Sequence, residues 1–155
     1  MKRYMRKIAI ALLAVMMFSS LAGYASASWA NIDIDQNFTG NEYTKLNETG
    51  SKGDTTPVYL KLETGPNSTH RVQALGCASN NNSQTANQTQ LENGTFVNYV
   101  TCFRGTQYSI HSAIKERGYS YATLSICPMG GSGWITGEWS PDSRYTYTHA
   151  AMTYN

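Results

Sequence analysis

The sequence has few charged residues, few cysteines and only one long apolar run. Charged residues make up 14% of the 155 residues, and long stretches rich in Ala, Leu, Glu and Lys, which favour helices, are missing. The apolar run lies at the N-terminus, and no second run is long enough for a membrane span. Most of the remaining chain is rich in Thr, Ser, Asn, Gly and Tyr. This composition favours an all-β domain with polar turns.

The N-terminal segment is typical of a secretory signal peptide. Four basic residues precede an apolar run from Ile8 to about Phe18, and the small residues Ala25-Ser26-Ala27 follow. The apolar run is shorter than the roughly 20 residues that a membrane-spanning helix needs. We therefore expect residues 1–27 to be removed on export and the mature protein to be secreted, without a membrane span.

The net charge of the mature chain bears on whether it is expected to bind polyanions such as nucleic acid. Four of the 12 Lys and Arg residues lie in the signal peptide, whereas all 10 Asp and Glu residues follow it, so the mature net charge is −2. A slightly acidic protein gives no reason to expect binding to nucleic acid or to anionic lipid. The expected partner is an extracellular ligand or a cell surface.

Three cysteines, Cys77, Cys102 and Cys127, are each separated by 25 residues. This spacing, without any C-x-x-C pair, argues against a zinc site, and we expect neither a metal nor a cofactor. An oxidising compartment permits one disulfide. Cys77 and Cys102 are the favoured candidates because they flank a long polar loop, but the other two pairings stay open.

A period of two along the chain predicts strands. Residues 58–64 read Val-Tyr-Leu-Lys-Leu-Glu-Thr, and residues 119–127 alternate in the same way. This places Leu60, Leu62, Leu124 and Ile126 in the core. About six short strands separated by turns predict a small antiparallel β-sandwich or barrel. The other strands are expected at 41–47, 70–77, 95–103 and 133–139.

The β domain is expected to span residues 42–143. A flexible mature N-terminus, 28–41, precedes it, and a C-terminal extension, 144–155, follows it. Residues 109–117 fit two patterns, an extended segment and one short helix that begins near Ser109 and ends before Gly118. Both alternatives stay open.

The stretch Gly-Glu-Trp-Ser-Pro-Asp-Ser-Arg, residues 137–144, contains two acids that could form a catalytic pair, Glu138 and Asp142. A structural turn explains the same residues better. Pro141 stops strand pairing, and the Ser140 and Asp142 side chains can accept hydrogen bonds from nearby backbone N–H groups. In this interpretation Trp139 packs in the core, Asp142→Asn is mild and no catalytic site is present.

Three aromatic residues are candidates for a binding surface: Tyr119, Tyr121 and Trp134. Tyrosines opposite a buried strand face are partly exposed, and aromatic platforms among Asn, Ser and Thr suit carbohydrate or protein ligands. Cross-strand packing is the alternative reason for aromatic residues on a sheet.

Four segments together resemble a group of small secreted proteins of Gram-positive bacteria that end in G-x-W-S-P-D-S and have no assigned activity. The segments lie at 57–63, 70–76, 105–126 and 137–143. A looser similarity is to lactococcin-type bacteriocins, which are small β-sandwiches. The resemblance implies origin and fold class. The expected function is therefore surface interaction by a secreted, non-catalytic protein, and a bacteriocin-like antimicrobial activity is the alternative.

Overall fold

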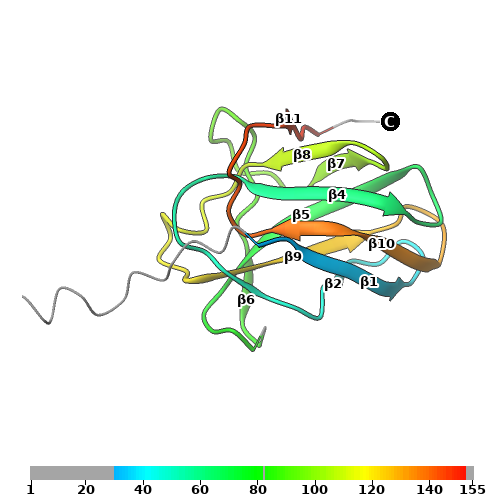
Figure 1. Cartoon of the computed structure of the whole chain (residues 1–155), viewed down its shortest axis with the longest axis horizontal. Coiled ribbons are helices and arrows are strands. Elements are labelled where there is room, and N and C mark those ends of the chain that lie inside the picture. The colour runs from blue at the N-terminus through cyan, green and yellow to red at the C-terminus, as the bar shows by residue number, and fades with distance from the viewer. Residues whose placement is uncertain (1–29, 82, 153–155) are drawn as a thin grey trace, which may run out of the picture.

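Two β-sheets that share one apolar core make up the structure, a computed structural model that describes residues 30–81 and 83–152 (Figure 1). These residues form eleven strands and no helix. The prediction of a small all-β sandwich or barrel is confirmed. The predicted number of about six strands was too low, because several of the eleven strands are only two to four residues long and leave little pattern in the sequence. The predicted signal peptide lies outside the described residues.

The first sheet has five strands, and its outer face carries the candidate site. Neighbouring strands are antiparallel except for the last two, which are parallel. In order across the sheet they are β1 (Ile32–Phe38), β10 (Gly133–Ser140), β4 (Val58–Thr64), β8 (Gln107–Ile110) and β11 (Thr148–His149).

The second sheet has six strands and is centred on two long ones, β9 (Tyr121–Cys127) and β5 (Thr69–Cys77), which pair over seven residues. Four short strands flank this pair. They are β2 (Thr44–Lys45) and β3 (Gly50–Ser51) beside β9, and β6 (Thr85–Asn87) and β7 (Val100–Phe103) beside β5.

Alternating apolar side chains from both sheets fill the core. Leu60 and Leu62 of β4 and Leu124 and Ile126 of β9 are at most 1% exposed, so their predicted burial is confirmed. Trp139 of β10 is the largest of the fully buried side chains. Because each strand turns every second residue inward, the polar residues between them face outward.

Gly137 allows β10 to run close to β4. The register between these strands shifts at Thr136 and Gly137, which marks a bulge. A Cβ atom at Gly137 would lie 2.2 Å from the backbone oxygen of Lys61. Only glycine therefore fits here.

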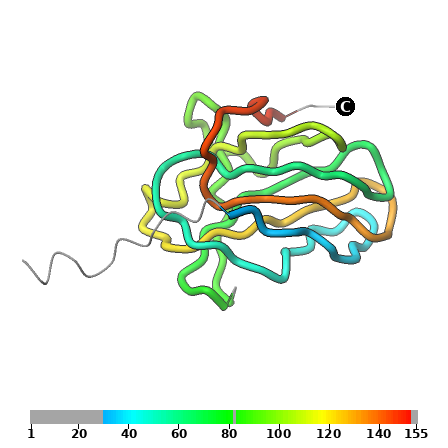
Figure 2. Tube along the Cα trace, in the orientation of Figure 1, coloured from blue at the N-terminus to red at the C-terminus, as the bar shows by residue number. Residues whose placement is uncertain are grey.

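The described parts of the two segments predicted to flank the domain, residues 30–41 and 144–152, each contribute a strand to the five-stranded sheet. Residues 28–41 were expected to be flexible, but β1 pairs with β10 along its whole length. Ile34 and Phe38 of β1 are buried, which explains why the segment is held. Residues 144–155 were expected to be an extension, but their described part contains β11, which pairs in parallel with β8. Figure 2 shows this segment, in red, beside the rest of the sandwich.

The short helix considered for residues 109–117 is not formed. Residues up to Ile110 belong to β8, and a turn at 114–118 follows. Ile110 and Ile114 are both fully buried, as either alternative required. The turn contains a helix-like hydrogen bond from the Arg117 N–H to the Ala113 oxygen, 2.9 Å, and ends at Gly118, whose φ of 83° suits glycine.

The predicted Cys77–Cys102 disulfide is wrong. Within the described residues, Cys77, Cys102 and Cys127 are buried thiols and form no disulfide. Cys102 pairs with His70 at one end of β5, whereas Cys77 lies at the other end. At about 3.3 Å per residue, the two thiols are roughly 20 Å apart, far beyond disulfide geometry.

Candidate functional site: an aromatic groove on the five-stranded sheet

A surface pocket of about 400 Å³ lies where the chain leaves β10 and crosses the outer face of the five-stranded sheet. We call it the outer groove. It combines tyrosines with polar and charged side chains, which is unlike the apolar core beneath it. Its lining residues are Asn31, Tyr59, Ser140, Asp142, Ser143, Arg144, Tyr145 and Tyr147.

The C-terminal segment forms one wall of this groove and is held at defined points. The Tyr147 N–H donates to the Ser109 hydroxyl of β8 across 2.9 Å, and the Ala150 N–H donates to the Ser109 backbone oxygen across 3.1 Å. Ser109 is fully buried. The segment therefore lies across β8 and β4 in a defined position.

Three tyrosines form a continuous aromatic cluster. The rings of Tyr59 and Tyr147 lie 4.7 Å apart between centroids, tilted by 42°. Tyr145 meets Tyr147 edge-on at 6.3 Å. Tyr145 is 63% exposed, so its ring faces solvent at the rim of the groove. The guanidinium carbon of Arg144 lies 6.0 Å from the centroid of the Tyr145 ring.

A hydrogen-bond network borders the groove, where it includes the lining residues Tyr59 and Asn31. The Tyr59 hydroxyl donates to Glu138 across 2.7 Å, Asn31 donates to the other Glu138 oxygen across 2.6 Å, and Gln107 donates to the Tyr59 hydroxyl across 3.1 Å. Burial and the hydrogen bond to Glu138 raise the pKa of Tyr59 to about 12. The same bond lowers the pKa of Glu138. At neutral pH the Glu138 carboxylate is therefore ionised, and the phenol of Tyr59 next to it is neutral.

A second, shallower pocket of about 630 Å³ continues the groove along β8. Tyr147 lines both pockets and joins them. The second pocket is lined otherwise by small and polar residues, with one cation, Lys61. Its other lining residues are Gly105, Thr106, Gln107, Thr146 and Thr148.

The three aromatics predicted to bind ligand do not form one surface. Trp134 is 60% exposed on β10 and shares the outer face with Glu138, but at the other end of the strand. Tyr121 lies on β9 of the six-stranded sheet. Tyr119 packs against the core, where a Cβ atom at Gly76 would lie 2.5 Å from its ring. The absence of a side chain at Gly76 thus leaves room for the Tyr119 ring, which was expected to face outward.

The main groove residues were missed because Tyr145 and Tyr147 fell in the supposed extension. A signal was available, since residues 145–148 read Tyr-Thr-Tyr-Thr, an alternation typical of an extended segment on a sheet. Tyr59 alternates with the core residue Leu60 and so lies on the outer side of its strand, but nothing local indicated what would cover it.

The structure places the predicted turn residues at the end of β10, with a different role for two of them. Trp139 is fully buried, and Pro141 follows the last paired residue of the strand. The Ser140 hydroxyl donates to the Asp142 backbone oxygen across 2.8 Å, where an acceptor role was expected. Asp142 is buried and reaches a distant loop, where it accepts the Gly53 N–H across 2.8 Å.

Glu138 and Asp142 have different hydrogen-bond partners. Glu138 accepts hydrogen bonds from Asn31 and Tyr59, which line the outer groove. The Asp142 carboxylate lies 2.6 Å from the Lys52 ammonium, and its side chain is 0% exposed. This arrangement differs from a glycosidase pair, in which both carboxyl groups face one sugar.

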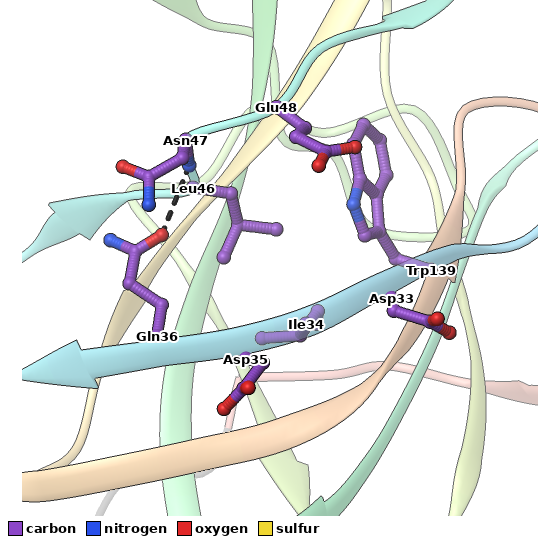
Figure 3. A pocket seen from close by; sticks show the side chains of 8 residues that line it. All are labelled: Asp33, Ile34, Asp35, Gln36, Leu46, Asn47, Glu48 and Trp139. Carbon is purple, nitrogen blue, oxygen red and sulfur yellow. Dashed lines mark hydrogen bonds between the residues drawn. The ribbon is translucent and has the colours of Figure 1, made fainter.

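Another pocket, of about 200 Å³, lies between β1 and residues 46–48 (Figure 3). Asp33, Asp35 and Glu48 line it together with the buried Trp139, and the Asn47 N–H donates to Gln36 across 3.0 Å. Within residues 30–81 and 83–152, no group of three His, Cys, Asp or Glu residues could hold a metal ion. This pocket is narrower than the outer groove and has no exposed aromatic side chain.

No helix in the described part of the chain is long and apolar enough to cross a membrane. Residues 18–143 match the model of one family, described as a protein of unknown function (DUF2712). No curated protein and no solved structure matches the chain.

Proposed function

We propose that this chain, which belongs to the DUF2712 family of unknown function, is a secreted, non-catalytic β-sandwich protein that binds a glycan of the cell surface. The outer groove is the proposed binding site. The observation that carries the proposal is the cluster of Tyr59, Tyr145 and Tyr147 beside the hydrogen-bonding groups of Glu138, Asn31 and Gln107.

The chemistry of the groove suits a sugar polymer. The C–H faces of sugar rings pack on aromatic rings, while their hydroxyls exchange hydrogen bonds with carboxylate and amide groups. The exposed Tyr145 ring offers such a platform, and the lining residue Tyr59 is hydrogen-bonded to the ionised Glu138 at the edge of the same pocket. Since the two pockets adjoin at Tyr147, the groove is long and open, as an extended chain requires.

Two features of the sequence support the extracellular setting. Residues 1–27 have the basic, apolar and small-residue order of an export signal. The resemblance to secreted Gram-positive proteins that end in G-x-W-S-P-D-S points the same way. Mass spectrometry of culture medium should detect a chain that starts at or near Ser28. Detection of only the uncut chain in the membrane fraction would contradict export.

The binding proposal is tested with purified cell-wall polysaccharides, first by pull-down and then by titration calorimetry. Tyr145→Ala and Tyr147→Ala should each weaken binding about tenfold or more, as aromatic anchors do when truncated. Phe103→Ala is the matched control, because Phe103 is 46% exposed but lies on β7 of the other sheet.

Equal affinities for the three variants and the unmodified protein would refute the groove as the site. Growth inhibition of neighbouring bacteria by the purified protein, without polysaccharide binding, would instead favour the bacteriocin-like alternative.

A further inference from the structure

Lys52 and Asp142 form a buried pair at the end of the sandwich where β3 and β10 finish. The Lys52 side chain is 1% exposed and the Asp142 side chain is 0% exposed. The Lys52 ammonium nitrogen lies 2.6 Å from Asp142 Oδ1. The two residues are 90 positions apart in the sequence, and the strands that they follow, β3 and β10, belong to different sheets.

The surroundings hold both groups in place. The Gly53 N–H donates to Asp142 Oδ2 across 2.8 Å, and Lys52 Nζ also donates to the Thr56 oxygen across 2.5 Å. A second carboxylate, Asp54, has its Oδ1 atom 3.9 Å from Lys52 Nζ. Asp54 is fixed in turn by the Thr56 N–H, across 2.8 Å, and by the Thr56 hydroxyl.

Burial makes the charged form of such a pair costly. Removing an ammonium and a carboxylate from water carries a penalty that their mutual attraction repays only in part. Attack on a carboxyl carbon requires an uncharged amine, and one proton passed along the Lys52–Asp142 hydrogen bond would supply it. An amine without its extra proton is a nucleophile, and here the acid carbon is its direct neighbour.

We propose that Lys52 and Asp142 condense to an intramolecular amide bond, with Asp54 as the proton acceptor. The Lys52 nitrogen attacks Asp142 Cγ, and a C–N bond forms. Asp54 takes a proton from the nitrogen and delivers it to the departing oxygen, so that one C–O bond breaks and water leaves. The net change joins an ammonium and a carboxylate into a neutral amide plus one water, with no oxidation or reduction.

Asp54 has the charge state that this role requires. Burial raises the pKa of its carboxyl, but hydrogen bonds from Thr56, the interaction with Asp142 and the charge of Lys52 outweigh burial, so the pKa lies below its ordinary value. Asp54 is therefore ionised at neutral pH and able to accept a proton. The Gly53 N–H, directed at Asp142 Oδ2, stabilises the negative charge that develops on that oxygen during attack.

The bond would connect the two sheets covalently and close a loop from residue 52 to residue 142. Such a link restricts the unfolded chain in the way that a disulfide does. None of the three cysteines, all in the described part of the chain, forms a disulfide.

The decisive measurement is the intact mass of the purified protein under denaturing, reducing conditions, with its N-terminus determined separately. The expected mass is that of the sequence less one water. Trypsin should then yield residues 46–61, uncut at Lys52, joined to residues 118–144. A mass equal to that of the sequence, or a loss of water without this joined pair, overturns the proposal.

Three variants separate the linkage from folding. Lys52→Arg keeps the positive charge but lacks the amine, and its mass should equal that of its sequence. Asp54→Asn keeps hydrogen-bonding atoms but loses the base, so the linked fraction should fall. Lys115→Arg is the control, because Lys115 donates only to the Lys52 backbone oxygen, and it should stay fully linked. A missing water in Lys52→Arg overturns the assignment, and the unmodified protein decides the question if a variant fails to fold.

Discussion

The Lys52 ammonium donates to the Asp142 carboxylate across 2.6 Å, in a site where both side chains are at most 1% exposed. This contact fastens the end of β10 to residues 52–56, which follow β3. The Ser143 N–H adds a hydrogen bond to the Thr56 hydroxyl across 3.2 Å. The turn after Trp139 therefore acts as a connection between the two sheets as well as a local chain reversal.

Asp142→Ala should destabilise the protein by about 3–5 kcal/mol or more, because the variant leaves Lys52 buried without its partner and cannot form the proposed amide link. Asp142→Asn should also be destabilising rather than mild, since an amide side chain supplies no negative charge to Lys52. Urea unfolding at pH 7 measures the change. The double variant Lys52→Met, Asp142→Leu should recover part of the loss, and an equal or greater loss would contradict this explanation.

Trp139→Ala should cost about 3–5 kcal/mol, the usual range for a buried aromatic side chain. Trp139 is fully buried between the sheets. Trp134→Ala is the matched control on the same strand. Because Trp134 is 60% exposed, its replacement should change the free energy of unfolding by no more than about 0.5 kcal/mol. Similar losses for the two variants would show that the burial pattern of β10 is wrong.

The stability of the protein should fall as the pH drops from about 7 to about 4, and His70 is one cause. Burial and the nearby charge of Arg104 lower the pKa of His70 from 6.5 to about 4, and neither ring nitrogen has a hydrogen-bond partner within the described residues. Between these pH values the unfolded chain binds a proton that the folded protein excludes, so unfolding is favoured as pH falls.

His70→Leu should flatten this pH dependence, measured as the free energy of unfolding at several pH values between 4 and 7. A smaller slope should remain, because burial and His149 also lower the pKa of His111. Parallel curves for the variant and the unmodified protein would exclude His70 as a source of acid sensitivity.

Gly76→Ala should destabilise the fold by about 1–3 kcal/mol, as overpacking of a tight core does. The added Cβ atom would lie 2.5 Å from the Tyr119 ring. In a Tyr119→Ala background the same change should cost clearly less, since the clash is removed. The double-mutant cycle measures this coupling, and strict additivity would mean that the two residues do not interact.

Local patterns predicted the strands where a segment decides its own structure. In residues 58–64 and 121–127 the period of two places alternate side chains on one face, and their apolar face is buried as expected. The same rule could have identified β1, because Ile32, Ile34 and Phe38 are separated by even steps. The polar residues between them led to the prediction of a flexible segment.

The binding surface could be predicted only in part. Trp134, one of the three aromatic candidates, is 60% exposed on β10. Tyr119 has the same residue type as Tyr121, yet it fills the space above Gly76. A tyrosine fits either a core or a surface, and the choice depends on a glycine 43 positions away in the sequence.

By itself, the sequence determined the all-β class, the positions of the best strands and the residues of the core, because these follow from side-chain order within a few neighbouring residues. Only the tertiary structure decided the separation of Cys77 from Cys102, the partner of Asp142 and the meeting of Tyr59 with Tyr147. Those relationships depend on strand register and sheet packing, which join residues that are distant along the chain. Local periodicity contains no information about which distant strand will be the neighbour.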